Sequence, residues 1–237
     1  MYVGNNGGTL YAFGVPSTST PTPTATTSPS PSPSPTNTVT VTPSTTPGTT
    51  FAQDTFMRPN QSHWGTASDG QTWGADANSL SAFSITNNSG QVTSSGVNRY
   101  SAILGPTATD ADVLVSGSSS NFNNANMGAI QRWTSATNYY QAALANGQLV
   151  LLKEANGTLT RLGSVNMTTS INTSYTVRFD VIGTTLSAKA WQTGTPEPTN
   201  WMLTANDSSL TSGYCGVHMY LQTGNTVQVT SFQATIP

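Results

Sequence analysis

The chain has 237 residues, only 7% of them charged, with 7 Lys or Arg, 9 Asp or Glu and a formal net charge of −2. It has no cluster of basic side chains to neutralise phosphates, which excludes a nucleic-acid-binding surface. No apolar run approaches the roughly 20 residues of a membrane-spanning helix, so insertion into a membrane is not expected.

The first 15 residues have the pattern of a β-hairpin. Two alternating runs flank Gly4–Gly8, whose Gly and Asn residues tolerate positive φ and favour a tight turn. Tyr2-Val-Gly4, Gly8 and Leu10-Tyr-Ala-Phe13 resemble the repeat of pyrroloquinoline-quinone-type β-propellers. The resemblance implies that residues 1–15 are the remnant of a propeller repeat. No cofactor is inferred from it, because many such repeats bind none.

Met1 is followed by neither a basic segment nor a long apolar run, so this chain contains no export signal of the usual kind. A single hairpin is marginally stable in water. We therefore expect Met1 to be an internal residue of a longer protein, with the rest of a propeller upstream.

Residues 16–50 contain nine of the 14 prolines, 21 Ser or Thr and no charged residue. Proline lacks an amide donor and fixes φ, so this segment cannot form a helix or a central strand. With little apolar surface to offset the entropy of ordering, it is predicted to be a disordered linker. Such tracts are typical of extracellular stalks that are often O-glycosylated. We expect a secreted or cell-surface protein, bacterial because cysteine is so scarce.

Residues 51–237 alternate between short β-type runs and turn residues, and no helical period lasts three turns. The pattern predicts an all-β domain of two antiparallel sheets packed face to face. The single cysteine, Cys215, excludes an internal disulfide and is predicted to be a buried, inert thiol. The expected strands are 113–116, 127–133, 139–144, 149–153, 175–181, 186–191, 216–222 and 227–234, with turns at Asn146-Gly147, Asn156-Gly157, Gly183-Thr184 and Thr223–Asn225.

Short motifs follow one another in a specific order along this domain. Asp54-Thr-Phe-Met-Arg58 opens it, Gly128–Thr134 is followed by Asn138-Tyr-Tyr140, and Ser212–Val217 precedes Thr230-Ser-Phe232. Their order and spacing resemble those of concanavalin A-like (laminin G/glucanase-type) jelly rolls, especially modules of bacterial extracellular proteins. The resemblance implies a jelly-roll sandwich whose closing strand lies beside the opening one. This fold serves many functions, so it does not decide this one.

Catalysis is the least favoured function. Retaining glycoside hydrolysis needs two carboxyl groups about 5 Å apart, and neither Glu154 nor Glu197 has an acidic partner at strand spacing. Asp110 and Asp112 form the one close acidic pair, and we expect them to cap a turn. His63 and His218 have no partner at zinc-ligand spacing. No catalytic residue is therefore predicted.

Calcium remains an open alternative. Many sandwich domains of this class bind calcium through Asp or Asn side chains and backbone carbonyls, the oxygen ligands that this cation prefers. The weak candidates are Asp54, Asp110, Asp112 and Asp207. No other metal and no cofactor is predicted.

Sugar binding is the favoured function, because aromatic faces cover the apolar side of a sugar ring while amides bind its hydroxyls. Strand alternation predicts that Gln131 and Trp133 share one face, opposite Ile130 and Arg132. His218 and Tyr220 likewise alternate with core-like neighbours. The predicted ligand contacts are Gln131, Trp133, His218 and Tyr220, with the loop residues Trp64 and Trp73 as further contacts.

The sequence thus predicts a noncatalytic extracellular module that binds a polysaccharide or a cell-surface glycan. Its domains would be a hairpin over residues 1–15, a linker over 16–50 and a jelly roll over 51–237. The alternative is a structural, assembly or adhesion unit that self-associates by strand pairing through residues 1–15. A glycoside hydrolase is the third possibility.

Overall fold

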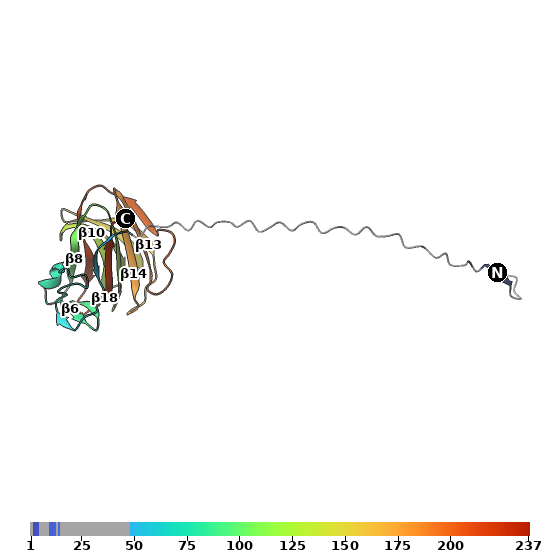
Figure 1. Ribbon diagram of the computed structural model, residues 1–237, viewed down its shortest axis with the longest axis horizontal. Helices are drawn as coiled ribbons and strands as arrows, with labels where there is room; N and C mark the ends of the chain where they lie inside the picture. The colour runs from blue at the N-terminus through green and yellow to red at the C-terminus, as the bar shows by residue number, and fades with distance from the viewer. Residues whose placement is uncertain (1, 5–9, 13, 15–47) are drawn as a thin grey trace. The chain divides into compact units, whose positions relative to one another are not determined.

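The computed structural model describes residues 2–4, 10–12, 14 and 48–237, which belong to two units, Met1–Ser44 and Thr45–Pro237 (Figure 1). In the first unit, β1 (Tyr2–Gly4) and β2 (Leu10–Ala12) pair antiparallel, with Val3 opposite Tyr11. The predicted linker lies outside the described residues except for its last three positions, and the propeller resemblance is not tested by two short strands.

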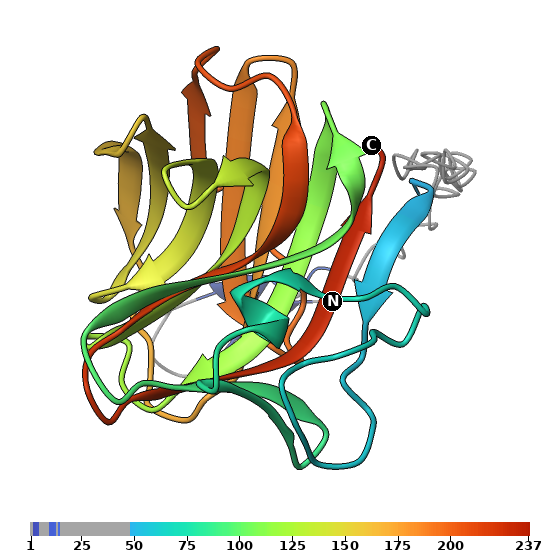
Figure 2. The same ribbon diagram turned by 90° about the vertical axis from the view of Figure 1, so that its left-hand side faces the viewer.

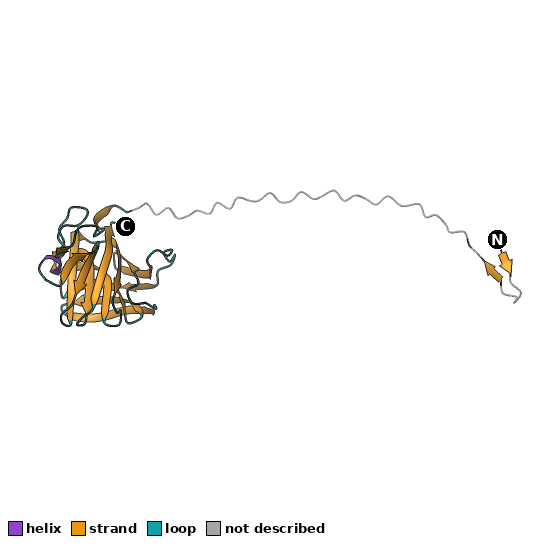
Figure 3. Ribbon diagram, turned by 90° about the horizontal axis from the view of Figure 1, so that it is seen from below, coloured by secondary structure: helices purple, strands orange, loops and turns teal. Residues whose placement is uncertain are grey.

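The second unit is a sandwich of two antiparallel sheets, as the sequence predicts (Figure 3). The seven-stranded sheet has the order β13-β12-β11-β10-β17-β8-β5, and the nine-stranded sheet has the order β16-β15-β14-β9-β18-β7-β6-β4 with β3 also paired to β18. Strands far apart in the sequence are neighbours in both sheets. Figure 2 shows this for β18, in red, which runs between β9 and the blue strand β3.

The strand bounds match the predicted runs, and most strands are longer than predicted. The seven-stranded sheet contains β5 (Gly74–Ala75), β8 (Asn98–Ala108), β10 (Ala125–Ser135), β11 (Asn138–Ala145), β12 (Gln148–Ala155), β13 (Thr158–Asn166) and β17 (Gly213–Leu221). The nine-stranded sheet contains β3 (Thr50–Asp54), β4 (Gln61–Ser62), β6 (Phe83–Thr86), β7 (Ser89–Thr93), β9 (Ala111–Ser119), β14 (Tyr175–Ile182), β15 (Thr185–Gln192), β16 (Leu203–Asn206) and β18 (Thr226–Thr235).

In the described part of the chain the only helix is the 3-10 turn η1 (Asp76–Asn78). No helix among these residues is long and apolar enough to cross a membrane.

The Asn-Gly turns form as predicted. Asn146 and Gly147 connect β11 to β12 with φ values of 50° and 71°, and Asn156 and Gly157 connect β12 to β13 with 50° and 76°. Two consecutive positive φ values define the turn that matches the twist of a hairpin, and Asn and Gly tolerate them best. These two turns build the meander that ends at β13.

The opening and closing motifs pair as the resemblance implies, with Phe232 of β18 opposite Asp54 of β3. Asp54 is buried, and its carboxylate accepts hydrogen bonds from the Arg58 guanidinium at 2.8 and 3.0 Å and from the Trp73 indole at 2.6 Å. Trp64 packs edge-on against Trp73, with ring centres 4.8 Å apart. Cys215 also faces the core, and burial raises the pKa of its thiol to about 12.

The core cluster corrects one prediction. Trp64 and Trp73 are 0% and 1% exposed, so neither can contact a ligand. Their neighbours in the sequence are Gly, Ser and Asp, but the loop folds inward and Asp54 supplies the indole N–H of Trp73 with its acceptor. These tryptophans stabilise the fold and do not bind sugar.

Candidate functional site

The outer face of the seven-stranded sheet is concave. Arg99 of β8 and Glu154 of β12 form an ion pair of 3.0 Å across this face. Three strands stand between β8 and β12 in the sheet order, so their backbones would be roughly 19 Å apart in a flat sheet. Side chains of these lengths can meet over that span only if the sheet curves toward them. We call this surface the concave face.

A cavity of about 350 Å³ opens on the concave face. This volume falls within the about 300–1,000 Å³ typical of ligand pockets. Six strands of the sheet contribute side chains, which combine aromatic rings, amides, a guanidinium and two leucines. They are Arg99, Asn126, Tyr139, Gln141, Leu152, Leu159, His218 and Tyr220.

Buried hydrogen bonds fix the back of this cavity. The Tyr139 hydroxyl donates to Glu154 Oε2 at 3.3 Å and lies 3.2 Å from His218 Nε2. His218 Nδ1 lies 3.2 Å from Ser101 Oγ. Since the Tyr139 hydroxyl has only one proton and Glu154 accepts it, His218 Nε2 must donate to Tyr139. His218 Nδ1 is then the acceptor for the Ser101 hydroxyl.

These groups keep their neutral forms. Burial, with the Arg99 charge acting in the same direction, lowers the pKa of His218 to about 3. Burial and the Glu154 carboxylate raise the pKa of Tyr139 far above its ordinary value of 10. Ser101 is buried and is absent from the cavity wall, and a histidine that remains neutral to about pH 3 is a weak base. The arrangement therefore positions the wall and does not activate a nucleophile.

The cavity presents both donors and acceptors that residues 48–237 leave available. Asn126 Oδ1 accepts from the Tyr220 amide at 2.7 Å, which leaves the Asn126 NH₂ group to donate. Gln141 Nε2 donates to the His218 carbonyl at 3.3 Å, which leaves Gln141 Oε1 to accept. Arg99 uses only one nitrogen for Glu154. No carboxylate is among the eight side chains that line the cavity. Such a site suits a neutral, polyhydroxylated ligand.

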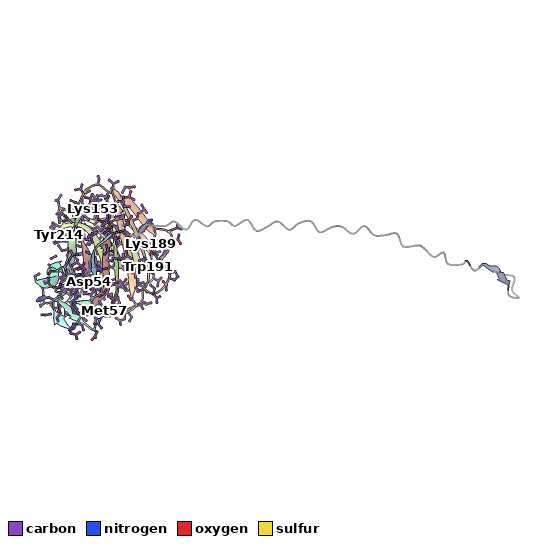
Figure 4. The ribbon with its side chains drawn as sticks, in the orientation of Figure 1. Asp54, Met57, Lys153, Lys189, Trp191 and Tyr214 are labelled. Atoms are coloured by element: carbon purple, nitrogen blue, oxygen red, sulfur yellow. The ribbon has the colours of Figure 1, made fainter. Side chains whose placement is uncertain are left out.

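A second aromatic position lies on the same face. Trp133 of β10 stands opposite Tyr214 of β17, with ring centres 6.4 Å apart. Tyr214, labelled in Figure 4, is 37% exposed. The Trp133 indole nitrogen is buried and has no hydrogen-bond partner among the described residues. Four residues of β17, roughly 13 Å, separate Tyr214 from His218, so one extended ligand could contact both places.

Gln131 and Trp133 lie on opposite faces of β10. Gln131 alternates with the core residues Met127 and Ala129, so it points between the sheets, where its amide donates to the carbonyls of Ala111 and Phe179 at 2.9 and 2.6 Å. A β-bulge follows it, since Arg132 has a φ of 51° and the register of β10 shifts against both neighbouring strands. Trp133 lies on the concave face with Ile130 instead of opposite it. The prediction for Gln131 is wrong.

Two other predicted residues, His218 and Tyr220, line the cavity together. Their role in binding stays a prediction. The sequence analysis missed Arg99, Asn126, Tyr139, Gln141, Leu152 and Leu159. Alternation on β11 was the available clue, because Tyr139 and Gln141 alternate with the core residues Tyr140 and Ala142.

Each of the four aspartates predicted as possible calcium ligands forms an ion pair with a basic side chain of the protein. Asp54 pairs with Arg58, Asp110 with Arg132 at 3.3 Å, Asp112 with Arg178 and Asp207 with Lys153. No group of three acidic, His or Cys side chains within the described residues is arranged to hold a metal ion. The carboxylates that would ligate calcium already have their charge compensated. Asp112 also differs from the predicted turn cap, since it lies within β9 and binds Arg178.

No protein-family model and no curated protein matches this sequence. Solved structures do match its fold. The carbohydrate binding module CBM66 from Bacillus subtilis has a TM-score of 0.51 at 16% identity, covering 68% of this chain and 91% of that one. The exoplasmic/lumenal domain of VIP36, in a form bound to Ca²⁺ and Man3GlcNAc, has a TM-score of 0.50 at 11% identity, covering 66% and 81%.

A longer protein shares the fold over part of its length. The GH43 protein BlXynB from Bacillus licheniformis has a TM-score of 0.55 at 11% identity, covering 78% of this chain and 39% of that one. At these identities the three likenesses show a common β-sandwich fold. An all-β sandwich of two antiparallel sheets is the fold that the sequence predicts.

Proposed function

We propose that the concave face binds a neutral carbohydrate without cleaving it. The observation that carries this proposal is the cavity itself, which combines Tyr220 and His218 rings with amide donors and acceptors and has no lining carboxylate. A sugar offers hydroxyls of both hydrogen-bonding roles and an apolar ring face, which match these groups. Similar folds occur in a carbohydrate binding module and in a domain bound to Man3GlcNAc, which supports the same conclusion.

Hydrolysis is disfavoured by the surroundings of Glu154. Its carboxylate is buried, accepts the Tyr139 proton and pairs with Arg99. A retaining or inverting glycosidase needs a second carboxyl group within about 5–10 Å. The cavity wall provides none. The wild-type chain should therefore not hydrolyse xylan or β-glucan, and mutating Glu154 and Glu197 together should change nothing in that assay.

The setting we infer is extracellular. The uncharged Pro/Ser/Thr segment of residues 16–50 is the main support, because tracts of this composition act as solvated stalks outside cells. We propose that the sandwich domain is the ligand-binding end of such a tethered, bacterial surface or secreted protein.

A glycan microarray and pull-down on insoluble xylan, chitin and cellulose test the proposal with the full chain. Tyr220→Ala and Trp133→Ala should each weaken binding by about 2 kcal/mol, or roughly 30-fold, as for an aromatic hot spot. Trp191→Ala is the matched control, because Trp191 is also half-buried but lies on the outer face of the other sheet. Unchanged binding by both concave-face variants, with thermal midpoints preserved, would contradict the proposal.

One observation favours a second function for the N-terminal unit. Among the described residues, β1 and β2 pair only with each other, which leaves both outer edges of the hairpin open. Open edges accept further strands. We propose strand pairing through residues 1–15 as the alternative role, adhesion or assembly. Sedimentation equilibrium of the full chain and of residues 45–237, each over a range of concentrations, tests this role. If both proteins stay monomeric at every concentration, strand pairing through residues 1–15 is excluded.

A further inference from the structure

A second cavity, of about 460 Å³, lies on the outer face of the nine-stranded sheet. It shares no lining residue with the concave cavity. Strands β9, β14 and β18 contribute Asp112, Asp180 and Gln233, and the segment before β16 contributes Trp201. In Figure 4, Lys189 of this face and Tyr214 of the concave face are labelled on opposite sides of the domain.

Charges around this cavity do not balance. The Arg178 guanidinium donates to Asp112 through Nε at 2.9 Å and to Glu197 through Nη1 at 2.7 Å. Lys189 also pairs with Glu197, at 2.7 Å. Two cations thus satisfy two carboxylates. Asp180 is a third carboxylate and has no cation of its own.

Asp180 stands at the centre of the imbalance. It lies opposite Asp112 on β9 and opposite Ser187 on β15, and Arg178 and Ile182 are its same-face neighbours along β14. No hydrogen bond or ion pair from residues 48–237 reaches its carboxylate. Partial burial, then the charges of Asp112 and Asp110, raise the pKa of Asp180 to about 6 although Arg178 opposes them. A half-buried carboxylate without a partner is costly when ionised, so a bound cation would stabilise it.

Trp201 gives the cavity a ring-binding wall. Its ring centre lies 4.7 Å from Lys189 Nζ and 5.8 Å from the Arg178 guanidinium, which hold the indole over the sheet. The residue nevertheless stays 38% exposed. Gln233 Nε2 donates to Thr50 Oγ1 at 3.0 Å, which leaves the Gln233 carbonyl oxygen to accept from a ligand hydroxyl.

We propose that this cavity binds an amino sugar with a free amino group. The ammonium pairs with Asp180, the apolar face of the sugar ring packs on Trp201, and a ring hydroxyl donates to Gln233. A neutral sugar would satisfy the last two contacts but would leave the Asp180 charge uncompensated. An N-acetylated sugar lacks the ammonium, so the site discriminates against it.

Calorimetry with the full chain tests this proposal, using the β-1,4-linked glucosamine trimer and its N-acetylated counterpart at about pH 6.5. We expect the free-amine trimer to bind at least about tenfold more tightly. Asp180→Asn should remove that preference and Trp201→Ala should weaken binding of the amine trimer about tenfold. Asp69→Asn removes the same charge from an exposed loop and should change nothing. Tyr220→Ala should leave the preference for the free-amine trimer intact, which separates this site from the concave one.

Lowering the pH gives an independent readout, because binding of the free-amine trimer should weaken below about pH 6 as Asp180 gains a proton. Equal affinity for the two trimers would overturn the proposal. So would an Asp180→Asn variant that keeps its thermal midpoint and the full preference, or the absence of any binding by the amine trimer.

Discussion

On the concave face, buried polar groups satisfy one another through the chain of His218, Tyr139 and Glu154, with Arg99 balancing the carboxylate. On the outer face of the nine-stranded sheet, Asp180 has no partner among residues 48–237. Both faces carry aromatic side chains and a cavity. The difference in charge balance suits the first face to a neutral ligand and the second to a cationic one.

The largest expected effect comes from acid on His218. The folded pKa of His218, about 3, lies below its ordinary value of 6.5, so the unfolded chain binds the proton first. Stability contributed by the neutral ring is therefore complete above about pH 6.5. It is lost as pH falls toward 3, at up to about 1.4 kcal/mol per pH unit.

Urea denaturation at successive pH values, comparing wild type with His218→Gln, measures that loss. The variant should be less stable than wild type near pH 7, with the gap closing toward pH 4. A gap independent of pH would show that His218 is not held neutral.

The chain has only two glutamates, one on each face, and they make a matched pair. Glu154→Gln weakens the acceptor of Tyr139 and removes the charge that balances Arg99 in a buried setting. It should cost about 1–3 kcal/mol of unfolding free energy. Glu197→Gln breaks partly exposed ion pairs and should cost less than about 1 kcal/mol. Equal losses in urea denaturation would contradict the comparison of the faces.

The smallest effect concerns Asp180, whose pKa is raised in the folded state. Its ionisation opposes folding, so wild type pays this penalty above about pH 6 and not below pH 3.8. Asp180→Asn should therefore raise the thermal midpoint at pH 8 and leave it unchanged near pH 4. The gain should stay within about 1 kcal/mol because the carboxylate is only half-buried. A loss of stability at pH 8 would show that Asp180 has a partner after all.

The fold could be predicted from the sequence because its determinants are local or periodic. Asn146-Gly147 and Asn156-Gly157 specify tight turns by their tolerance of positive φ, and alternation on β17 separates His218 and Tyr220 from the core. Two of the eight residues that line the cavity follow from that alternation.

The remaining site depends on contacts between distant segments. The bulge that reverses the face of Trp133 places Arg132 where its guanidinium donates to the carbonyls of Thr109, Leu210 and Gly183. Strand alternation cannot foresee such a shift. Arg99 and Glu154 are 55 residues apart in sequence, and only the curvature of the sheet brings them together. Trp73 shows the same limit, because the buried acceptor of its indole N–H is Asp54 at the end of β3, 19 residues away in the sequence.

The five tryptophans allow the central claim to be tested in one measurement, because they report on three different environments. Trp133 lies on the concave face, Trp191 and Trp201 on the other outer face, and Trp64 and Trp73 in the core. Indole N–H resonances of the full chain, recorded while titrating the tightest-binding neutral oligosaccharide from the microarray, should show a large shift for Trp133, whose N–H has no partner among the described residues. The other four resonances should hardly move. A shift of Trp191 or Trp201 with Trp133 unchanged would contradict the assignment of the concave face as the carbohydrate site.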